Sequence, residues 1–250
     1  MPGLASRGPR QAGPPETNPL SPCSSRWGKQ HLLVAHKDPI ARIVDARHVA
    51  SASSLEQMPA PVGVEIAFAG RSNVGKSSLL NAVTGRRSLV RVSRTPGCTR
   101  QVSFFEARLA DGAHITLVDL PGYGYAKRSK RERAAWGELI EGFLLGRSTL
   151  KAVAVLVDAR RGPEAEEFDL LQLLAAPPTV SRNPLEALII ATKLDRLPAS
   201  QRKLALQRIG TAMSRRVIGF STQQPELVPQ LVVQIRRAVG LVSATLPAGG

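Results

Sequence analysis

A glycine-rich segment between two apolar runs constrains this chain more than any other feature. Residues 70–78 read Gly-Arg-Ser-Asn-Val-Gly-Lys-Ser-Ser, which fits the pattern G-x-x-x-x-G-K-[ST]. The run 64–69 before it predicts a short buried strand, and the run 78–84 after it predicts the first turns of a helix. In this strand–loop–helix context the segment is typical of a phosphate-binding loop, and an ordinary glycine-rich turn is the alternative.

Each residue type in this segment suits the phosphates of a nucleotide. Gly70 and Gly75 permit backbone angles and a close approach that a Cβ atom would block. We expect Lys76 to reach the β- and γ-phosphates and the Ser77 hydroxyl to bind a magnesium ion. The amino end of the following helix adds a partial positive charge that favours an anion. The segment therefore predicts a Mg²⁺-dependent nucleotide site.

A second motif, Asp119-Leu120-Pro121-Gly122, directly follows the strand-like run 114–118. An aspartate at a strand end suits an outer-sphere magnesium ligand, and a glycine three residues later suits a backbone N–H that points at a γ-phosphate. Alone, this motif is a weak signal, because most copies of D-x-x-G are ordinary turns. Its place after a predicted strand favours the nucleotide interpretation.

A third motif, Thr192-Lys193-Leu194-Asp195, follows the apolar run 186–191. The Asp195 carboxylate can accept hydrogen bonds from the N1–H and the 2-amino group of guanine, whereas adenine offers neither donor. The stem of Lys193 can lie along the plane of the base. Alone, the tetrapeptide could be a surface charge pair. Three motifs in this order, each at the end of a predicted strand, predict a guanine nucleotide-binding domain.

Together the motifs resemble those of the EngB family (also called YihA/YsxC) of bacterial translation-factor-related GTPases. The run Pro-Gly-Tyr-Gly-Tyr-Ala-Lys at 121–127 and the threonine-type motif at 192–195 distinguish this family from Ras-like GTPases. The similarity extends from about residue 43 to residue 241. The matching segments are 70–78, 95–101, 119–127, 192–195 and 220–222.

The resemblance implies roles for further residues. Thr99 would supply the magnesium ligand of the first switch loop, beside Ser77 and the outer-sphere Asp119. Ser221 and Thr222 would lie beside the guanine O6. The complete set of expected nucleotide contacts is Gly70, Arg71, Ser72, Asn73, Val74, Gly75, Lys76, Ser77, Gly97, Cys98, Thr99, Arg100, Gln101, Asp119, Leu120, Pro121, Gly122, Thr192, Lys193, Leu194, Asp195, Phe220, Ser221 and Thr222. Cys98 stands where the family has a basic residue, which alters the local charge but not the role of Thr99.

The expected reaction is GTP hydrolysis, with Lys76 and Thr99 as catalytic groups. Ras-like GTPases use a glutamine after the D-x-x-G glycine to orient the attacking water, and here that position is Tyr123. Related potassium-stimulated GTPases bind a monovalent cation at the position of Asn73, so K⁺ there could replace an arginine finger. Alternatively, Asn73 is a loop residue that tolerates unusual backbone angles. A partner could also order the switches, and intrinsic hydrolysis is expected to be slow in either case.

The formal net charge of +15 is unevenly distributed. Between Arg86 and Arg133, eleven Lys and Arg residues stand against four Asp and Glu, so these 48 residues, which include both switch loops, carry nearly half of the excess. Basic residues around a nucleotide-sensing surface predict an RNA partner, and a solvated charged face is the alternative. Only ten residues are aromatic, so base stacking on single-stranded RNA is expected to be minor.

Two cysteines, Cys23 and Cys98, are too few for a disulfide framework and agree with a reducing cytoplasm. No apolar stretch reaches the roughly 20 residues that a membrane helix needs, and the amino-terminal region lacks the apolar core of a signal peptide. We therefore expect a cytoplasmic protein without a membrane partner. We also expect it to be a monomer.

The chain divides into four segments. Residues 1–30, with six prolines and four glycines, are expected to be a disordered tail, and residues 31–61 a transitional segment with a strand or short helix near 41–51. Residues 62–241 are expected to form the GTPase domain, and residues 242–250 a flexible tail. The expected fold is α/β, a P-loop GTPase domain with a mostly parallel six-stranded sheet, one antiparallel strand and helices on both faces. Strands are expected near 63–69, 102–109, 114–119, 152–158, 186–192 and 216–221.

Three helix starts have local signals. Ser129 with Glu132 forms a capping-box pattern ahead of an apolar face of Trp136, Ile140, Phe143 and Leu144. Pro163 suits the first turn of another helix. The last helix should begin between Pro225 and Pro229, because a proline deeper in the helix would break it.

The resemblance implies a GTP·Mg²⁺ switch that acts in assembly of the large ribosomal subunit through its rRNA, with a link to cell division and septation. Two alternatives stay open at this point. One is a division-site signalling switch with a protein partner, and the other is a nucleotide-binding RNA chaperone without meaningful turnover.

Overall fold

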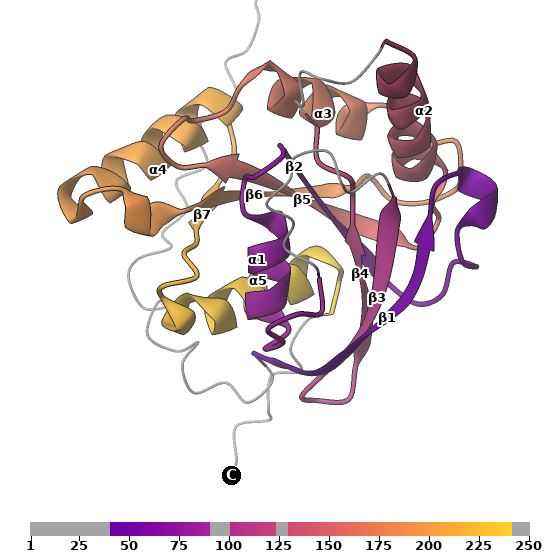
Figure 1. The fold of residues 1–250 in the computed structure, drawn as a ribbon, viewed down its shortest axis with the longest axis horizontal. Coiled ribbons are helices and arrows are strands. Elements are labelled where there is room, and N and C mark those ends of the chain that lie inside the picture. Colours follow the sequence, from indigo (N-terminus) through magenta and orange to yellow (C-terminus); the bar gives the residue numbers. More distant parts are fainter. Residues whose placement is uncertain (1–40, 91–100, 124–129, 242–250) are drawn as a thin grey trace, which may run out of the picture.

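A seven-stranded sheet forms the centre of the molecule (Figure 1). The computed structural model describes residues 41–90, 101–123 and 130–241, although not the side chains of 130–136. The sheet order is β1-β3-β4-β2-β5-β6-β7. The strands are β1 (Ile43–Ala52), β2 (Glu65–Gly70), β3 (Val102–Leu109), β4 (His114–Asp119), β5 (Leu150–Asp158), β6 (Glu186–Thr192) and β7 (Val217–Gly219).

Only β3 runs against its neighbours: it pairs antiparallel with β1 and with β4, whereas the other adjacent strands pair in parallel. The single antiparallel strand is therefore confirmed. The predicted number of six strands is wrong, because β1 adds a seventh strand at the edge. Two register shifts interrupt the pairing of β1 with β3 and break the period-two pattern of burial that identifies a strand in a sequence. The sheet thus begins at Ile43, ahead of the expected domain boundary at residue 62.

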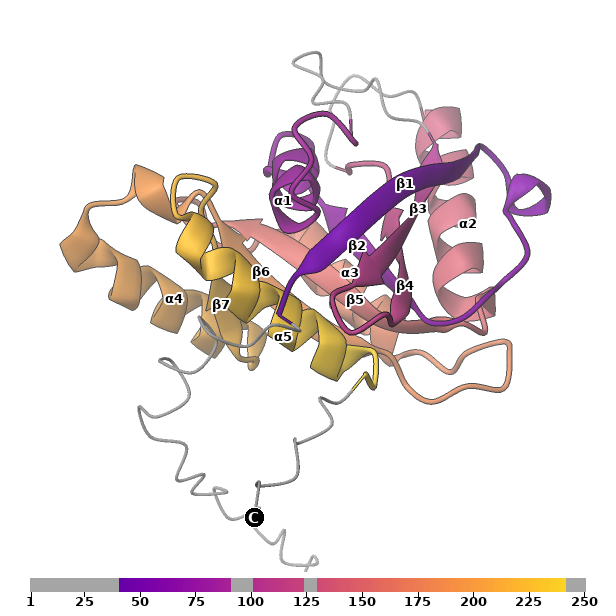
Figure 2. The ribbon, with the colours of Figure 1, turned by 90° about the horizontal axis from the view of Figure 1, so that it is seen from below.

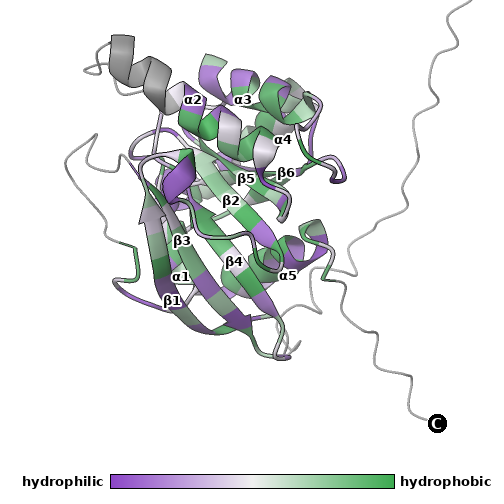
Figure 3. Ribbon diagram, turned by 90° about the vertical axis from the view of Figure 1, so that its right-hand side faces the viewer, coloured by the Kyte–Doolittle hydropathy of each residue, from purple (hydrophilic) through white to green (hydrophobic). Residues whose placement is uncertain are grey.

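Within the described residues, five α-helices cover the two faces of the sheet (Figures 1 and 2). One hydrophobic core lies beneath α1 and α5, and a second lies beneath α2, α3 and α4. The central strands β2 and β5 contribute buried apolar residues to both cores, and Figure 3 shows hydrophobic residues along β2. The helices are α1 (Lys76–Val83), α2 (Lys130–Gly146), α3 (Ala165–Ala175), α4 (Ala199–Met213) and α5 (Val228–Ala238).

The helices begin close to the residues that the local sequence signals predict, and the start of α3 differs from its predicted position. In α3 a capping box joins Glu164 and Glu167, so Pro163 lies just before the helix and not in its first turn. A 3-10 turn, Pro225–Leu227, leads into α5, whose first turn contains Pro229 as expected. Ile140, Phe143 and Leu144 are buried in the core as predicted, whereas Ser129 and the side chain of Trp136 lie outside the described residues.

In the described part of the chain, no helix has the length and apolar character needed to cross a bilayer.

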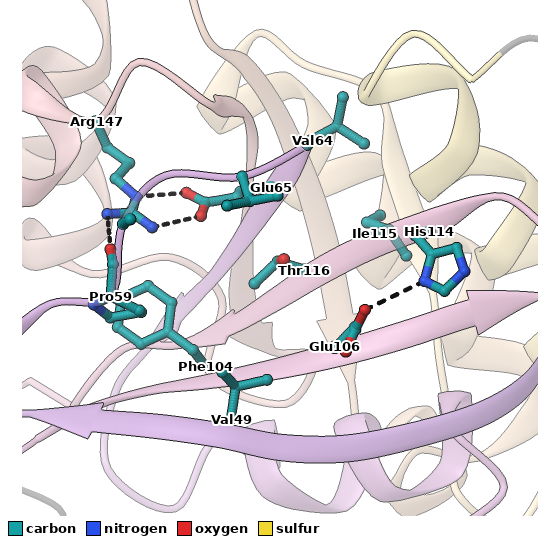
Figure 4. A pocket seen from close by; sticks show the side chains of 13 residues that line it. Val49, Pro59, Val64, Glu65, Phe104, Glu106, His114, Ile115, Thr116 and Arg147 are labelled. Atoms are coloured by element: carbon teal, nitrogen blue, oxygen red, sulfur yellow. Dashed lines mark hydrogen bonds and ion pairs between the residues drawn. The ribbon is translucent and has the colours of Figure 1, made fainter.

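A buried ion pair lies at the amino end of β2, away from the phosphate-binding loop (Figure 4). The Arg147 guanidinium donates two hydrogen bonds to the Glu65 carboxylate, at 2.8 and 2.7 Å, and one to the Pro59 carbonyl at 2.7 Å. It also lies 5.3 Å from the centre of the Phe104 ring. These groups border a pocket of about 390 Å³ and tie the connection before β2 to the end of α2.

Replacing Arg147 with Met should lower the free energy of unfolding by about 3–5 kcal/mol, because Glu65 would be left as a buried, uncompensated charge. Arg47→Met is the matched control: it breaks an ion pair with Glu106 in which the Arg47 side chain is 75% exposed, and it should cost less than about 1 kcal/mol. Urea denaturation of both variants measures the difference. Equal losses would contradict a structural role for the buried pair.

Candidate nucleotide-binding site

The phosphate-loop segment lies between β2 and α1, as the sequence predicts. Gly75 has φ of 109° and precedes the first residue of α1, and Asn73 has φ of 65°. A Cβ at Gly70 would lie 2.8 Å from Val74 Cγ1 and 3.0 Å from Leu156 Cβ. The first glycine is thus required by packing against β5, and the second by backbone conformation.

Lys76 and Asp119 form a buried ion pair, in which the side chains are 8% and 3% exposed. Lys76 is the first residue of α1, and Asp119 is the last residue of β4, which pairs in parallel with β2. The parallel pairing therefore brings the predicted phosphate-binding cation next to the predicted magnesium carboxylate. The Ser77 hydroxyl lies one residue after Lys76 in the chain. The Asp119 carboxylate and this hydroxyl are oxygen ligands of the type that Mg²⁺ prefers, and Mg²⁺ needs only one or two protein ligands besides phosphates.

The D-x-x-G loop packs directly on the phosphate loop. The Ser72 N–H donates a hydrogen bond to the Tyr123 carbonyl at 2.9 Å, and Arg71 and Tyr123 form a parallel bridge. A Cβ at Gly122 would lie 3.2 Å from the Ser72 Cα and N atoms. Only glycine lets the two loops approach this closely without a shift of the backbone.

Tyr123, at the position of the Ras-like glutamine, is 7% exposed and packs in the core beneath α2 and α3. Burial raises its pKa, and the neighbouring Glu167 raises it further. Burial also raises the pKa of Glu167, against the opposing effects of Tyr123 and Arg71. A buried tyrosine beside a carboxyl group is poorly placed to orient a water at a phosphate.

The third motif anchors the phosphate loop to β6. The Thr192 hydroxyl donates to the Val74 carbonyl at 2.6 Å, and Thr192 is 2% exposed. The Lys193 ammonium donates to the Asn73 carbonyl and, at 3.0 Å, to the Asp158 carboxylate. The left-handed backbone of Lys193, with φ of 57°, directs the chain into the following turn.

Asp158 was not predicted from the sequence. It ends β5 and accepts hydrogen bonds from Arg160 and Lys193. Burial alone would raise the pKa of its carboxyl, but these two cations outweigh that effect and hold the pKa below its ordinary value. Together with Arg71 and Asn73 these residues line a polar pocket of about 350 Å³ beside the phosphate loop. The available signal was an aspartate at the end of an apolar run, the same signal that identified Asp119.

The expected base-reading residues come together at the ends of β6 and β7. The Ser221 hydroxyl donates to the Asp195 carboxylate at 2.6 Å and accepts from the Gln223 N–H at 3.0 Å. The Leu194 N–H donates to the Phe220 carbonyl at 3.3 Å. These bonds fix the orientation of the Asp195 carboxylate.

The remaining predicted contacts have diverse surroundings. The side chains of Leu120, Leu194 and Phe220 are buried in the cores and hold the backbone of their own loops in place. Thr222 is exposed. Arg71 pairs with Glu164 and Glu166 of the α3 start. Gln101 donates to the Ser53 hydroxyl at 3.0 Å. Gly97, Cys98, Thr99 and Arg100 lie outside the described residues.

The motif loops at the ends of β2, β4 and β6, on a mixed sheet covered by helices on both faces, define the class: this is the α/β fold of the P-loop GTPases. A solved structure described as "Crystal structure of a probable GTP-binding protein engB" matches with a TM-score of 0.56 and 21% identity, over 72% of this chain and all of that one. The predicted fold class is confirmed.

Residues 65–193 match the family described as 50S ribosome-binding GTPase. "Probable GTP-binding protein EngB" of Desulforapulum autotrophicum is 44% identical over 184 residues, which are 72% of this chain and 90% of that protein. The protein of the same name in Anaeromyxobacter sp. is 38% identical over 216 residues, 83% of this chain and 97% of that protein. The chain belongs to the EngB family of 50S ribosome-binding GTPases, which confirms the resemblance inferred from the motifs.

Thr192→Val should lower the free energy of unfolding by about 1–3 kcal/mol, because the buried Val74 carbonyl would lose its hydrogen-bond donor. Thr222→Val makes the same chemical change at an exposed position and should alter stability by less than about 0.5 kcal/mol. Urea denaturation without added nucleotide isolates the structural effect. If the two variants were equally stable, Thr192 would not anchor the phosphate loop.

Proposed function

We propose that this protein binds GTP with Mg²⁺, hydrolyses it slowly and acts as a nucleotide-dependent switch on the large ribosomal subunit or its precursor. The observation that carries the proposal is that Lys193 joins the loop of the guanine-type carboxylate, Asp195, to the phosphate loop. At the end of that loop, Lys76 pairs with Asp119 of β4 as a phosphate- and metal-binding pair. Membership of the EngB family supports the ribosomal partner.

At the base end, Ser221 occupies one hydrogen-bonding position of Asp195. A carboxylate has about four lone-pair sites, so Asp195 can still accept from guanine N1–H and the 2-amino group. Adenine would leave the carboxylate desolvated without a donor, which disfavours ATP.

At the phosphate end, Lys76 would face the β- and γ-phosphates, and Ser77 and Thr99, with Asp119 in the outer sphere, would hold Mg²⁺. When bound, Mg²⁺ would supply positive charge that offsets the negative charge of the phosphates. Gly122 packs against Ser72, and its N–H would donate to the γ-phosphate. Because GDP has no γ-phosphate, this contact would distinguish GTP from GDP.

Hydrolysis is expected to be slow because Tyr123 is buried beside Glu167 and supplies no water-orienting group. A potassium ion held at Asn73, or the ribosomal partner, would raise the rate. The left-handed backbone at Asn73 agrees with the alternative role as a loop residue, so the side chain itself has to be tested.

Because ribosomal subunits assemble in the cytoplasm, we place the protein there, acting as a monomer. A cell that lacks new large subunits cannot sustain growth, so loss of the protein should also disturb division and septation. Co-sedimentation with purified large subunits in the GTP-analogue and GDP states tests the proposed partner. Capture of division proteins without ribosomal binding would contradict it.

Asp195→Asn should reduce GTP affinity by on the order of 10²-fold, because the amide cannot accept both guanine donors. Relative affinity for xanthosine triphosphate should rise, since the amide can donate to the xanthine O2. Asp169→Asn, at an exposed position of α3, removes the same charge and should leave both affinities unchanged. Titration with fluorescent nucleotides measures all three proteins, and unchanged GTP binding by Asp195→Asn would remove this residue from the site.

Potassium should stimulate hydrolysis more than sodium at equal ionic strength if the Asn73 side chain holds a cation. Asn73→Gly is the appropriate variant, because glycine keeps the φ of 65° without strain and retains the carbonyl that Lys193 contacts. It should erase the difference between the two salts and leave GDP affinity intact. Phosphate-release rates measure this, and equal wild-type rates in both salts would leave Asn73 as a loop residue only.

A further inference from the structure

The segment that directly follows the base-reading motif in the sequence has an unusual charge distribution. From residue 196 to residue 216 the chain carries six basic side chains and no acidic one. This segment contains α4 and leads into β7, and we call its outer surface the α4–β7 edge. Its basic residues are Arg196, Arg202, Lys203, Arg208, Arg215 and Arg216.

Several cations of this edge lack carboxylate partners, unlike many cations elsewhere. Arg47, Arg86, Arg160 and Arg236 each form an ion pair with a nearby carboxylate. By contrast, no ion pair of the described structure involves four exposed residues of the edge, namely Lys203, Arg208, Arg215 and Arg216. The edge is therefore a concentration of uncompensated positive charge.

The helix itself adds to this charge. The first turn of α4 has no acidic residue, and Arg202 and Lys203 directly follow it. The amino end of a helix is partially positive and normally carries acids, as α3 does with Glu166 and Glu167. Arg202 donates a hydrogen bond to the Leu197 carbonyl at 3.1 Å, but no carboxylate of the described residues pairs with Arg202 or Lys203, so an external anion is the partner that would compensate their charge.

The edge is well separated from β1 and is open to a large partner. Strand β7 is the last strand of the sheet, and α4 lies beside it at the end of the molecule opposite β1 (Figures 1 and 2). The 15 residues of α4 span about 22 Å at 1.5 Å per residue. A surface of this length can follow several consecutive phosphates of a nucleic acid.

The edge is connected to the base end of the nucleotide site. Asp195 lies four residues before α4, and a Cβ at Gly219 of β7 would meet Leu194 at 3.0 Å and Leu206 of α4 at 3.2 Å. Guanine is the same in GTP and GDP, so this part of the protein has no contact that distinguishes the two nucleotides. Its charge is therefore presented in both states.

We propose that the α4–β7 edge is a second RNA-binding surface, which contacts the phosphate backbone of ribosomal RNA whether GTP or GDP is bound. Five of its six cations are arginines, whose planar guanidinium groups bind phosphate in a bidentate manner. Within α4, Leu204 is the one large apolar side chain that is strongly exposed, at 47%, so the surface lacks the apolar anchors typical of protein and membrane contacts.

The inference rests on the proposed action on the large subunit and divides the binding into two parts. The switch region would respond to GTP, whereas the edge would hold the protein on RNA during the whole nucleotide cycle. Product release would then not require immediate dissociation from the particle.

The test is a triple neutralisation, Lys203→Gln, Arg208→Gln and Arg215→Gln, compared with the matched control Arg42→Gln, Arg47→Gln and Arg237→Gln. The control residues are exposed and lie outside both basic segments: Arg42 directly precedes β1, Arg47 lies in β1, and Arg237 lies in the last turn of α5. Both variants lose the same net charge. Urea denaturation and GDP titration first establish that both are folded and bind nucleotide.

Sedimentation with purified large subunits is then measured across a salt series in the GTP-analogue and GDP states. The edge variant should bind about tenfold or more weakly in both states, and its log–log salt slope should fall by about 3. The control should retain wild-type binding and slope. An equal loss in the control, an unchanged edge variant, or a loss confined to the GTP state would overturn the inference.

A second measurement separates this inference from the proposed function. Binding of the wild-type and edge variant to a duplex RNA is compared with binding to polyglutamate and to anionic phospholipid vesicles. If wild-type protein failed to bind large subunits but bound duplex RNA through the edge, the proposed ribosomal partner would be wrong and the RNA surface would stand. If the edge variant lost only polyglutamate or vesicle binding, the RNA assignment would be overturned.

Discussion

Strands β4, β2, β5 and β6 run in the same direction and pair with one another, so their carboxyl ends meet at one edge of the sheet. Residues separated by more than a hundred positions therefore become neighbours, as in the hydrogen bond from Thr192 to the Val74 carbonyl. Each functional loop depends on this alignment. The buried apolar strands, covered by helices on both faces, hold the alignment in place.

Polar contacts then set the finer geometry of the loops. Lys193 connects the phosphate loop to Asp158, and Ser221 orients Asp195. Gly122 lets the second motif lie against Ser72. Since these contacts link the base end, the phosphate end and the start of the second switch loop, the site is one continuous hydrogen-bonded unit.

The two basic surfaces have different relations to this unit. In the proposed site, the α4–β7 edge adjoins the base end, where GTP and GDP are alike, whereas the sequence assigns the switch region to the phosphate end, where they differ. A protein that uses both would change its affinity for RNA with nucleotide state without losing all contact. This division would give the two basic segments of the sequence, 86–133 and 196–216, separate roles.

Periodicity and motif spacing were sufficient to predict the P-loop GTPase fold and the placement of the motifs at strand ends, because strand ends and glycine positions are local properties of the chain. The family was predicted from the resemblance of the motif residues to those of EngB proteins. The burial of Ile140, Phe143 and Leu144 followed from helical spacing in the same way. For β1 the sequence left a strand or a short helix open, because the register shifts of this strand disturb the alternation by which strands are recognised.

Other features were decided only by the tertiary structure. The pairing of Arg147 with Glu65, the place of Asp158 beside Lys193 and the burial of Tyr123 against α3 join residues far apart in the sequence. The basic composition of the α4–β7 edge can be read from the sequence, but the lack of carboxylate partners for Lys203, Arg208, Arg215 and Arg216 cannot. Charge and residue type are properties of a sequence, whereas compensation of a charge depends on which side chains the packed sheet and helices bring within contact distance.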